Sequence, residues 1–124
     1  MPTLHAQAQL EHWRWLGNQI RCALRPDDAR LILQYLAAAR QIGASKDSSL
    51  TTWDTTSHAL ELLLDTAADE VLPETWRIQC LELAQLPLVE LRQLACSATE
   101  KARSAQLAER HAGQHIRPAP RFDD

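Results

Sequence analysis

Glycine is scarce in this chain: only Gly17, Gly43 and Gly113 occur among its 124 residues, and they lie far apart. Phosphate-binding loops need several closely spaced glycines, because their backbone amides must approach the phosphate groups without side chains in the way. The sequence therefore excludes Walker-type nucleotide sites and the glycine-rich fingerprint of dinucleotide-binding folds.

β-branched aliphatic residues are also scarce, and this shortage indicates the fold class. Val and Ile contribute seven residues in total, whereas Leu contributes 20 and Ala contributes 19. Leu and Ala lose little conformational freedom in a helix, while Val and Ile are enriched in strands. A chain of 124 residues has the length of one domain. We therefore predict a single all-α domain.

Cysteine is limited to Cys22, Cys80 and Cys96, and no two of them form a Cys-x-x-Cys pair. We expect reduced thiols, with Cys80 and Cys96 in the core, as in a cytoplasmic protein. The longest Leu run, residues 62–64, is far shorter than the roughly 20 apolar residues of a membrane span. The first residues lack the basic start and apolar stretch of a signal peptide. The sequence therefore predicts a cytoplasmic protein that does not contact membranes.

Prolines and glycines divide the chain into five expected helices. Pro26, Pro73 and Pro87 suit the first turns of helices, and Gly43 and Gly113 suit helix ends. On this basis the helices are expected over residues 3–24, 26–43, 51–71, 73–86 and 87–112.

These helices are expected to form a four- or five-helix bundle over residues 1–112. Residues 113–124 contain two prolines and no periodicity, and we predict a flexible tail there. The helix expected over residues 51–71 carries the clearest core stripe, with steps of three and four between Trp53, Ser57, Leu60, Leu64, Ala67 and Val71.

Charge is distributed unevenly along the chain. Residues 1–46 hold six basic and three acidic side chains, and residues 91–124 hold six basic and four acidic ones. Residues 47–90 hold one basic and nine acidic side chains. Two interpretations stay open: the acidic helices pack beside basic ones and the field cancels within the bundle, or the acidic surface faces a basic partner. Nucleic-acid binding by the acidic segment is not expected, because phosphates bind Lys and Arg.

An acidic face runs along the helix expected over residues 51–71. Its members share one side of the helix because they step by three or four residues: Asp54, His58, Glu61, Asp65 and Asp69. Such a face can bind a metal ion in a bundle, provided that facing helices supply further ligands. No Glu-x-x-His pair occurs in the chain, so we expect no metal and no cofactor. The four carboxylates are instead candidates for binding a protein partner.

Two apolar side chains fall on the opposite side of their helices from the expected core. Trp15 lies about 200° around the helix from Trp13, and Leu62 lies opposite the core stripe of its helix. A large apolar side chain on an outer face favours an interface, and Trp often anchors such contacts. We therefore predict that Trp15 and Leu62 contribute to self-association or to partner binding.

Arg110 and His115 are separated by four residues near the end of the chain. This six-residue pattern resembles the signature of HEPN-domain ribonucleases, in which an Arg precedes a His by a short spacer. Members of that family are small helical bundles. The resemblance implies RNA cleavage in a composite site at a dimer interface, with Arg110 and His115 as the catalytic pair.

The absence of an enzyme signature elsewhere favours a binding function. We predict a small non-catalytic protein-binding module, such as an adaptor, a chaperone-like protein or an inhibitor, which acts through an acidic and partly apolar helical surface. The expected partner is a protein, basic if the acidic face is the contact, and we expect a homo-oligomer or a subunit of a larger complex. Two alternatives stay open: a HEPN-like ribonuclease or toxin, and a helical subunit of a nucleoprotein complex.

Overall fold

The computed structural model describes residues 3–116 and consists of six α-helices joined by short turns. The helices are α1 (Leu4–Arg21), α2 (Arg30–Ala44), α3 (Thr52–Ala68), α4 (Glu74–Leu83), α5 (Gln85–Leu94) and α6 (Ala98–Gly113). Only Ala84 separates α4 from α5, and its own backbone is helical, so the two form one bent helix. No strand occurs among the described residues. The prediction of an all-α fold is confirmed.

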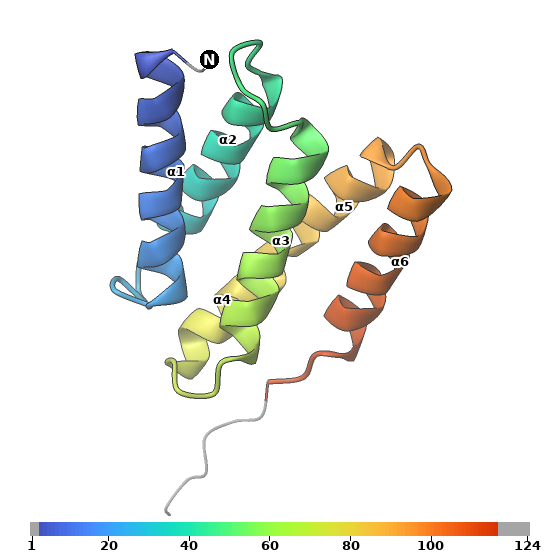
Figure 1. Cartoon of the computed structure of the whole chain (residues 1–124). Coiled ribbons are helices and arrows are strands. Elements are labelled where there is room, and N and C mark those ends of the chain that lie inside the picture. Colours follow the sequence, from blue (N-terminus) through green and yellow to red (C-terminus); the bar gives the residue numbers. More distant parts are fainter. Residues whose placement is uncertain (1–2, 117–124) are drawn as a thin grey trace, which may run out of the picture.

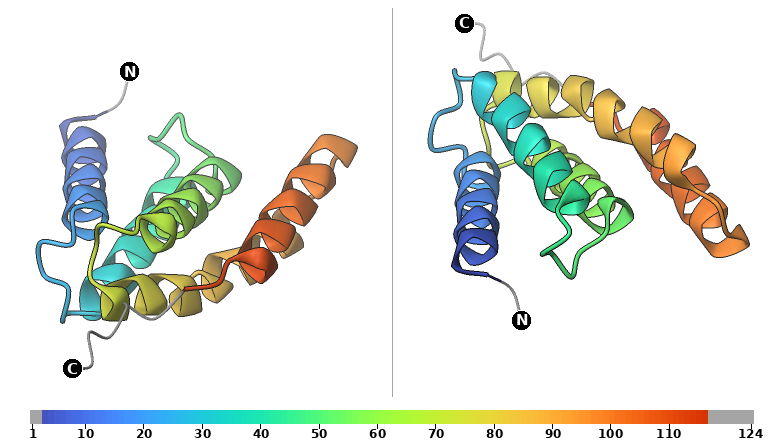
Figure 2. Two further views of the ribbon diagram at one scale, coloured as in Figure 1. Left: turned by 90° about the horizontal axis from the view of Figure 1, so that it is seen from below. Right: turned by 90° about the horizontal axis from the view of Figure 1, so that it is seen from above.

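Helix α3 lies at the centre of the molecule and packs against each of the other five helices. In Figure 1, α2 passes behind α1 and α3, and the α4–α5 unit passes behind α3 to reach α6. Seen from below and from above, α1 and α6 lie at opposite ends of the array, with α3 between them (Figure 2). As a consequence, α3 buries side chains on several of its sides.

The core is built around α3. Four of its apolar side chains have no exposed surface, namely Leu60, Leu63, Leu64 and Ala67. The core stripe expected from the sequence is therefore too narrow, because a central helix packs on more than one side. Its first members, Trp53 and Ser57, are only partly buried. Its last member is wrong, because Val71 lies beyond the end of α3 and is 92% exposed.

A turn at residues 95–97 divides the helix expected over residues 87–112. Ser97 Oγ accepts a hydrogen bond from the Glu100 amide at 3.0 Å, and the Glu100 carboxylate accepts one from the Ser97 amide at 3.2 Å. This capping box begins α6. The hydrogen bonds from the backbone amides of Cys96 and Ser97 lower the pKa of Glu100. The Ser-x-x-Glu signature is visible in the sequence, so this helix start is predictable in principle.

Gly43 and Gly113, which were expected to cap helices, lie inside the last turns of α2 and α6. Neither has a positive φ angle. Gly43 instead permits close packing, because a Cβ atom at this position would lie 2.6 Å from Thr52 Cα. Glycine is thus needed at position 43 because it has no side chain, and not because of its conformational freedom.

The folded body extends past the boundary expected at residue 112. Gln114 donates its side-chain amide to the Leu64 carbonyl at 2.9 Å, and Ile116 packs against the core. The rest of the expected tail, residues 117–124, lies outside the described residues, so its flexibility stays a prediction.

Two adjacent residues of α4 bind the ends of two other helices. Trp76 is fully buried, and its Nε1 donates to the Ile20 carbonyl at the end of α1 at 2.9 Å. Arg77 donates Nε to the Ala67 carbonyl at the end of α3 at 2.8 Å. A cation is favourable there, because the C-terminal end of a helix carries partial negative charge. These two bonds fix α1 and α3 relative to each other.

The end of α1 adopts a left-handed backbone without glycine. The Leu24 amide donates to the Gln19 carbonyl at 3.1 Å, and the Ala23 amide donates to the Ile20 carbonyl at 3.0 Å. This is the hydrogen-bond pattern of a Schellman motif. Ala23 occupies its left-handed position with a φ of 50°, which costs an L-residue about 1–2 kcal/mol.

Glycine at this position is expected to stabilise the protein. Ala23→Gly should raise the free energy of unfolding by about 0.5–1 kcal/mol, because glycine adopts the left-handed conformation without strain. Ala8, exposed in the middle of α1, is the matched control. Ala8→Gly should lower the same quantity by about 0.5–1 kcal/mol. Urea denaturation measures both, and a loss of stability in both variants would contradict the Schellman geometry.

A methyl group added at Gly43 is expected to destabilise the fold. Gly43→Ala should lower the free energy of unfolding by about 1–3 kcal/mol, because α2 must move away from the backbone of Thr52. Gly113 is the control, since nothing lies within 4 Å of a Cβ built there. Thermal melts should show a lower Tm for Gly43→Ala and an equal or higher Tm for Gly113→Ala. Equal melts for the two variants would show that α2 and α3 do not meet this closely.

Candidate functional site

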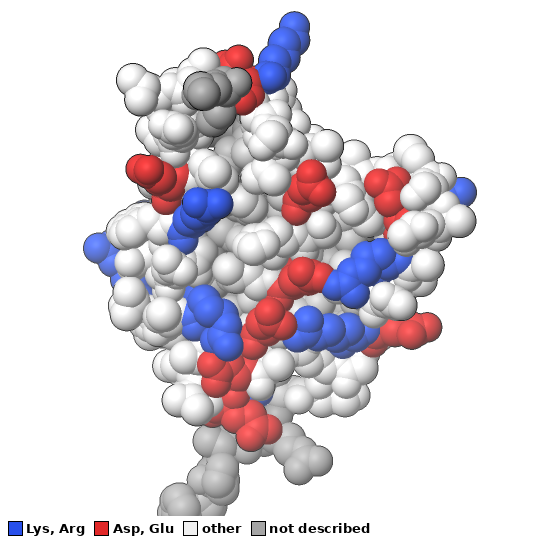
Figure 3. All heavy atoms as spheres, in the orientation of Figure 1, with Lys and Arg blue, Asp and Glu red and all other residues white. Residues whose placement is uncertain are grey.

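The acidic face predicted from the sequence lies along α3 and is flanked by arginines. Figure 3 shows acidic atoms in a diagonal stripe across this side of the molecule, with basic atoms on both sides of it. Glu61 forms an ion pair with Arg103 of α6. Asp65 forms one with Arg110, also of α6, at 2.7 Å. The middle of the face is therefore tied to the helix beside it.

Asp54 and Asp69 lie at the two ends of the same face and also have partners. The Asp54 carboxylate accepts a hydrogen bond from the Thr51 amide at 2.9 Å, as part of the capping box that begins α3. Asp69 accepts a hydrogen bond from Arg21 of α1 at 2.7 Å. That bond, together with one from the Val71 amide, lowers the pKa of Asp69. Each carboxylate of the face thus has a partner within the chain.

These contacts favour one of the two interpretations left open by the sequence, namely neutralisation of the acidic segment within the molecule. The ion pairs are nevertheless accessible, since the side chains of Asp65 and Arg110 are 53% and 39% exposed. Exposed ion pairs contribute only about 0–1 kcal/mol each. A basic group from another molecule can therefore compete for these carboxylates at low cost.

His58, the fifth member of the face, packs against an aromatic ring. Its ring centroid lies 5.2 Å from that of Trp13, at an interplanar angle of 59°. Among residues 3–116 no cluster of three His, Cys, Asp or Glu side chains has a metal-binding arrangement. The described residues therefore offer no candidate metal centre.

A groove lies between α1 and α3, and we call it the α1–α3 groove. Its larger part has a volume of about 500 Å³, and an adjoining part has a volume of about 180 Å³. Trp13, Arg14 and His58 line both parts. The larger part is also lined by Leu10, Leu50, Asp54, Ser57 and Glu61, and the smaller part by Gly17, Asn18, Tyr35 and Leu62.

The wall of the α1–α3 groove is aromatic and rigidly packed. Trp13 is 4% exposed and stacks on Tyr35 of α2, with 5.6 Å between ring centroids. Its Nε1 is buried and has no hydrogen-bond partner among residues 3–116. Burial also raises the pKa of Tyr35. This stacked pair lines the smaller part of the groove.

The structure places Trp15 and Leu62 in different surroundings. Trp15 is 50% exposed on α1 and stacks with His12 at 6.0 Å between centroids. Leu62 does not lie on an outer surface as expected. It is partly buried against α1, and a Cβ atom built at Gly17 would lie 3.1 Å from its Cδ1. Trp15 thus stays a candidate for contact with another molecule, whereas Leu62 belongs to the α1–α3 groove.

The sequence assigned several groove residues to other roles. His58 was expected only as a member of the acidic face, and Leu62 only as an outward-facing apolar side chain. The spacing of these residues places each on a helix face, but it does not say that α1 and α3 are neighbours. The groove therefore appears only when the helices are assembled.

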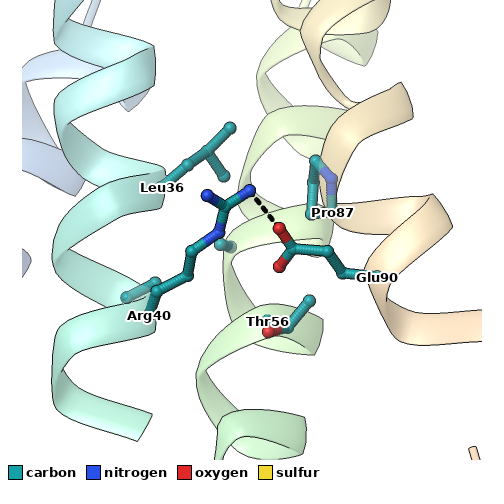
Figure 4. Close-up of a pocket in the computed structure, with 7 residues that line it drawn as sticks. Leu36, Arg40, Thr56, Pro87 and Glu90 are labelled. Carbon is teal, nitrogen blue, oxygen red and sulfur yellow. Dashed lines mark ion pairs between the residues drawn. The ribbon is translucent and has the colours of Figure 1, made fainter. Parts of the chain in front are cut away.

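A second cavity, between α2, α3 and α5, is too small for a ligand. Arg40 of α2 and Glu90 of α5 form an ion pair across it, beside Leu36, Thr56 and Pro87 (Figure 4). The accessible volume of about 10 Å³ holds one water molecule at most. The ion pair links α2 to α5, and the cavity is excluded as a binding site.

The residues of the HEPN-like pattern lie at the end of α6. Arg110 is paired with Asp65, and His115 is exposed beyond the last helical turn. RNA cleavage by this pair stays a prediction.

One of the two cysteines expected in the core is buried, and the other is exposed. Cys80 is buried as expected, and burial raises the pKa of its thiol to about 12. Cys96, also expected in the core, is exposed in the turn before α6. Cys22 is exposed as well. A thiol with so high a pKa is almost entirely protonated near neutral pH, so Cys80 is a packing residue.

No helix of the described chain is both long enough and apolar enough to cross a membrane. No protein-family profile, curated protein or solved structure matches this chain. The α1–α3 groove and the acidic face are the features of the described residues that bear on function.

Introducing a charge at Trp15 and at Leu62 is expected to distinguish a surface residue from a packed one. Trp15→Glu should change the free energy of unfolding by less than about 0.5 kcal/mol, because the ring is half-exposed. Leu62→Glu should lower it by about 1–3 kcal/mol, because the carboxylate is placed against α1. Urea denaturation measures both values. Equal stability of the two variants would show that Leu62 does not pack on α1.

Proposed function

We propose that this protein is a non-catalytic protein-binding module whose α1–α3 groove receives a short segment with an apolar and a basic side chain. The groove is the observation on which the proposal depends. An adaptor, a chaperone-like protein and an inhibitor all act by such binding, and the proposal covers this class as a whole.

The apolar part of the proposed segment is suited to the side chains at one end of the groove. Leu10 and Leu50 line the larger part together with the Trp13 ring. Removing apolar surface from water contributes roughly 25 cal/mol per Å². A Leu-sized side chain placed here would therefore supply about 1.5–3 kcal/mol of binding free energy.

The basic part of the segment is suited to the charge of the groove. Asp54 and Glu61 line the larger part from α3, and Arg14 lines it from α1. A basic side chain in the groove would meet both carboxylates and would compete with Arg103 of α6 for one of them, Glu61. The Asp54 carboxylate is also held in place by its capping hydrogen bond, so it is oriented before a ligand arrives. Complementary charge gives such a contact its specificity.

Binding of a model peptide tests the proposal. Acetyl-Leu-Arg-Ala-Leu-amide should shift the backbone NMR signals of groove residues such as Leu10, Ser57 and His58, and leave those of α5 unchanged. The analogue with Gln in place of Arg should bind more weakly by about two- to tenfold, because it lacks the charge that Asp54 and Glu61 attract.

A groove-filling substitution provides the matched control. Ser57→Phe places a ring in the larger part of the groove and should abolish peptide binding while circular dichroism stays that of the wild type. Thr75→Phe adds the same ring at an exposed position of α4 and should leave binding unchanged. Shifts spread over the whole surface, or unaltered binding by Ser57→Phe, would rule out the groove as the binding site.

A further inference from the structure

Glu61 belongs to two features of the molecule at once. It lines the α1–α3 groove on one side of α3. It also pairs with Arg103 of α6, the helix at the opposite end of the array from α1 (Figure 2). The side chains of Glu61 and Arg103 are 37% and 45% exposed. The carboxylate can therefore exchange one cationic partner for another without unfolding of the core.

Helix α6 depends on such polar contacts more than the other long helices do. Of its 16 residues only Ser104 and Leu107 are buried. By comparison, α1 buries the large side chains of Trp13, Leu16 and Ile20. A helix with little buried apolar surface opens at a lower free energy than the core.

Two further contacts of α6 are polar. Arg110 binds Asp65 at 2.7 Å, and the His111 ring lies 3.0 Å from the Leu81 carbonyl. An open hollow of about 410 Å³ lies between α5 and α6 and is lined mostly by small and polar side chains. The Glu61–Arg103 ion pair is therefore one of a small number of contacts that hold α6 against α3.

From this geometry we infer that Glu61 couples the α1–α3 groove to the docking of α6, so that a basic side chain in the groove displaces Arg103 and loosens α6. The inference rests on the proposed function, because it requires that a basic segment occupy the groove. Arg103 then acts as an internal competitor, which lowers the affinity of the groove for its ligand. By linkage, the Arg103 contact weakens ligand binding by the same factor by which the bound ligand weakens the Arg103 contact.

Two arginine variants test the coupling. Arg103→Gln removes the competitor of Glu61, and Arg110→Gln removes an equivalent ion pair whose carboxylate, Asp65, does not line the groove. NMR titration with acetyl-Leu-Arg-Ala-Leu-amide should show binding about two- to fivefold tighter for Arg103→Gln than for the wild type. Arg110→Gln should bind as the wild type does.

Hydrogen exchange supplies the reciprocal measurement. Saturation of the wild type with the peptide should raise the exchange rates of α6 amides about two- to fivefold, while those of α3 stay unchanged. In Arg103→Gln the α6 amides should exchange faster before peptide is added, and the peptide should raise their rates no further.

Each of three other results would contradict one step of the inference. Equal affinities of the wild type and Arg103→Gln would exclude the sharing of Glu61 and leave the proposed function intact. Equal tightening in Arg103→Gln and Arg110→Gln would show that release of α6, and not competition for Glu61, controls the groove. Absence of peptide binding by the wild type would reject the proposed function, and the coupling with it.

Discussion

The placement of α1 against α3 depends on two neighbouring side chains of α4. Trp76 and Arg77 are both buried, and each donates a hydrogen bond to the carbonyl end of a different helix, at Ile20 and Ala67. A buried donor that loses its acceptor costs about 1–3 kcal/mol. Separation of α1 from α3 would therefore leave at least one of the two donors without its acceptor. One turn of α4 thus helps to fix the spacing of α1 and α3, which also meet directly at Gly17 and Leu62.

The groove exists because these helices approach closely at one level and not at another. At Gly17 an added Cβ atom would lie 3.0 Å from the Tyr35 ring and 3.1 Å from Leu62, so the two helices are in tight contact there. Nearer the start of α3, larger gaps remain between Leu10 and Asp54, where the groove has its main volume. A binding hollow thus results from helices anchored firmly at their C-terminal ends.

Much of the fold was predictable from local patterns, because Leu and Ala content and helix-capping residues act over a few positions. The arginines that pair with the acidic face were not predictable in this way. Arg21 lies 48 residues from Asp69, and Arg110 lies 45 residues from Asp65. Periodicity says that the carboxylates share a face, but only assembly shows which helix lies beside it. The same limit applied to Leu62, whose exposure depended on whether α3 was central or peripheral.

Pairing within the chain also determines how the acidic face can act on another molecule. Arginines on both sides of the acidic face cancel much of its electric field. Dissolved salt screens the rest beyond a Debye length, which is about 8 Å at physiological ionic strength. Long-range steering of a basic partner is therefore weak, and recognition has to occur at short range. At that distance, binding depends on the difference in free energy between two ion pairs. One is the pair within the protein, and the other is the pair that the same carboxylate forms with the ligand. We infer that Glu61 is the carboxylate where this exchange takes place, since of the two described α3 carboxylates that pair with α6, Glu61 lines the groove and Asp65 does not.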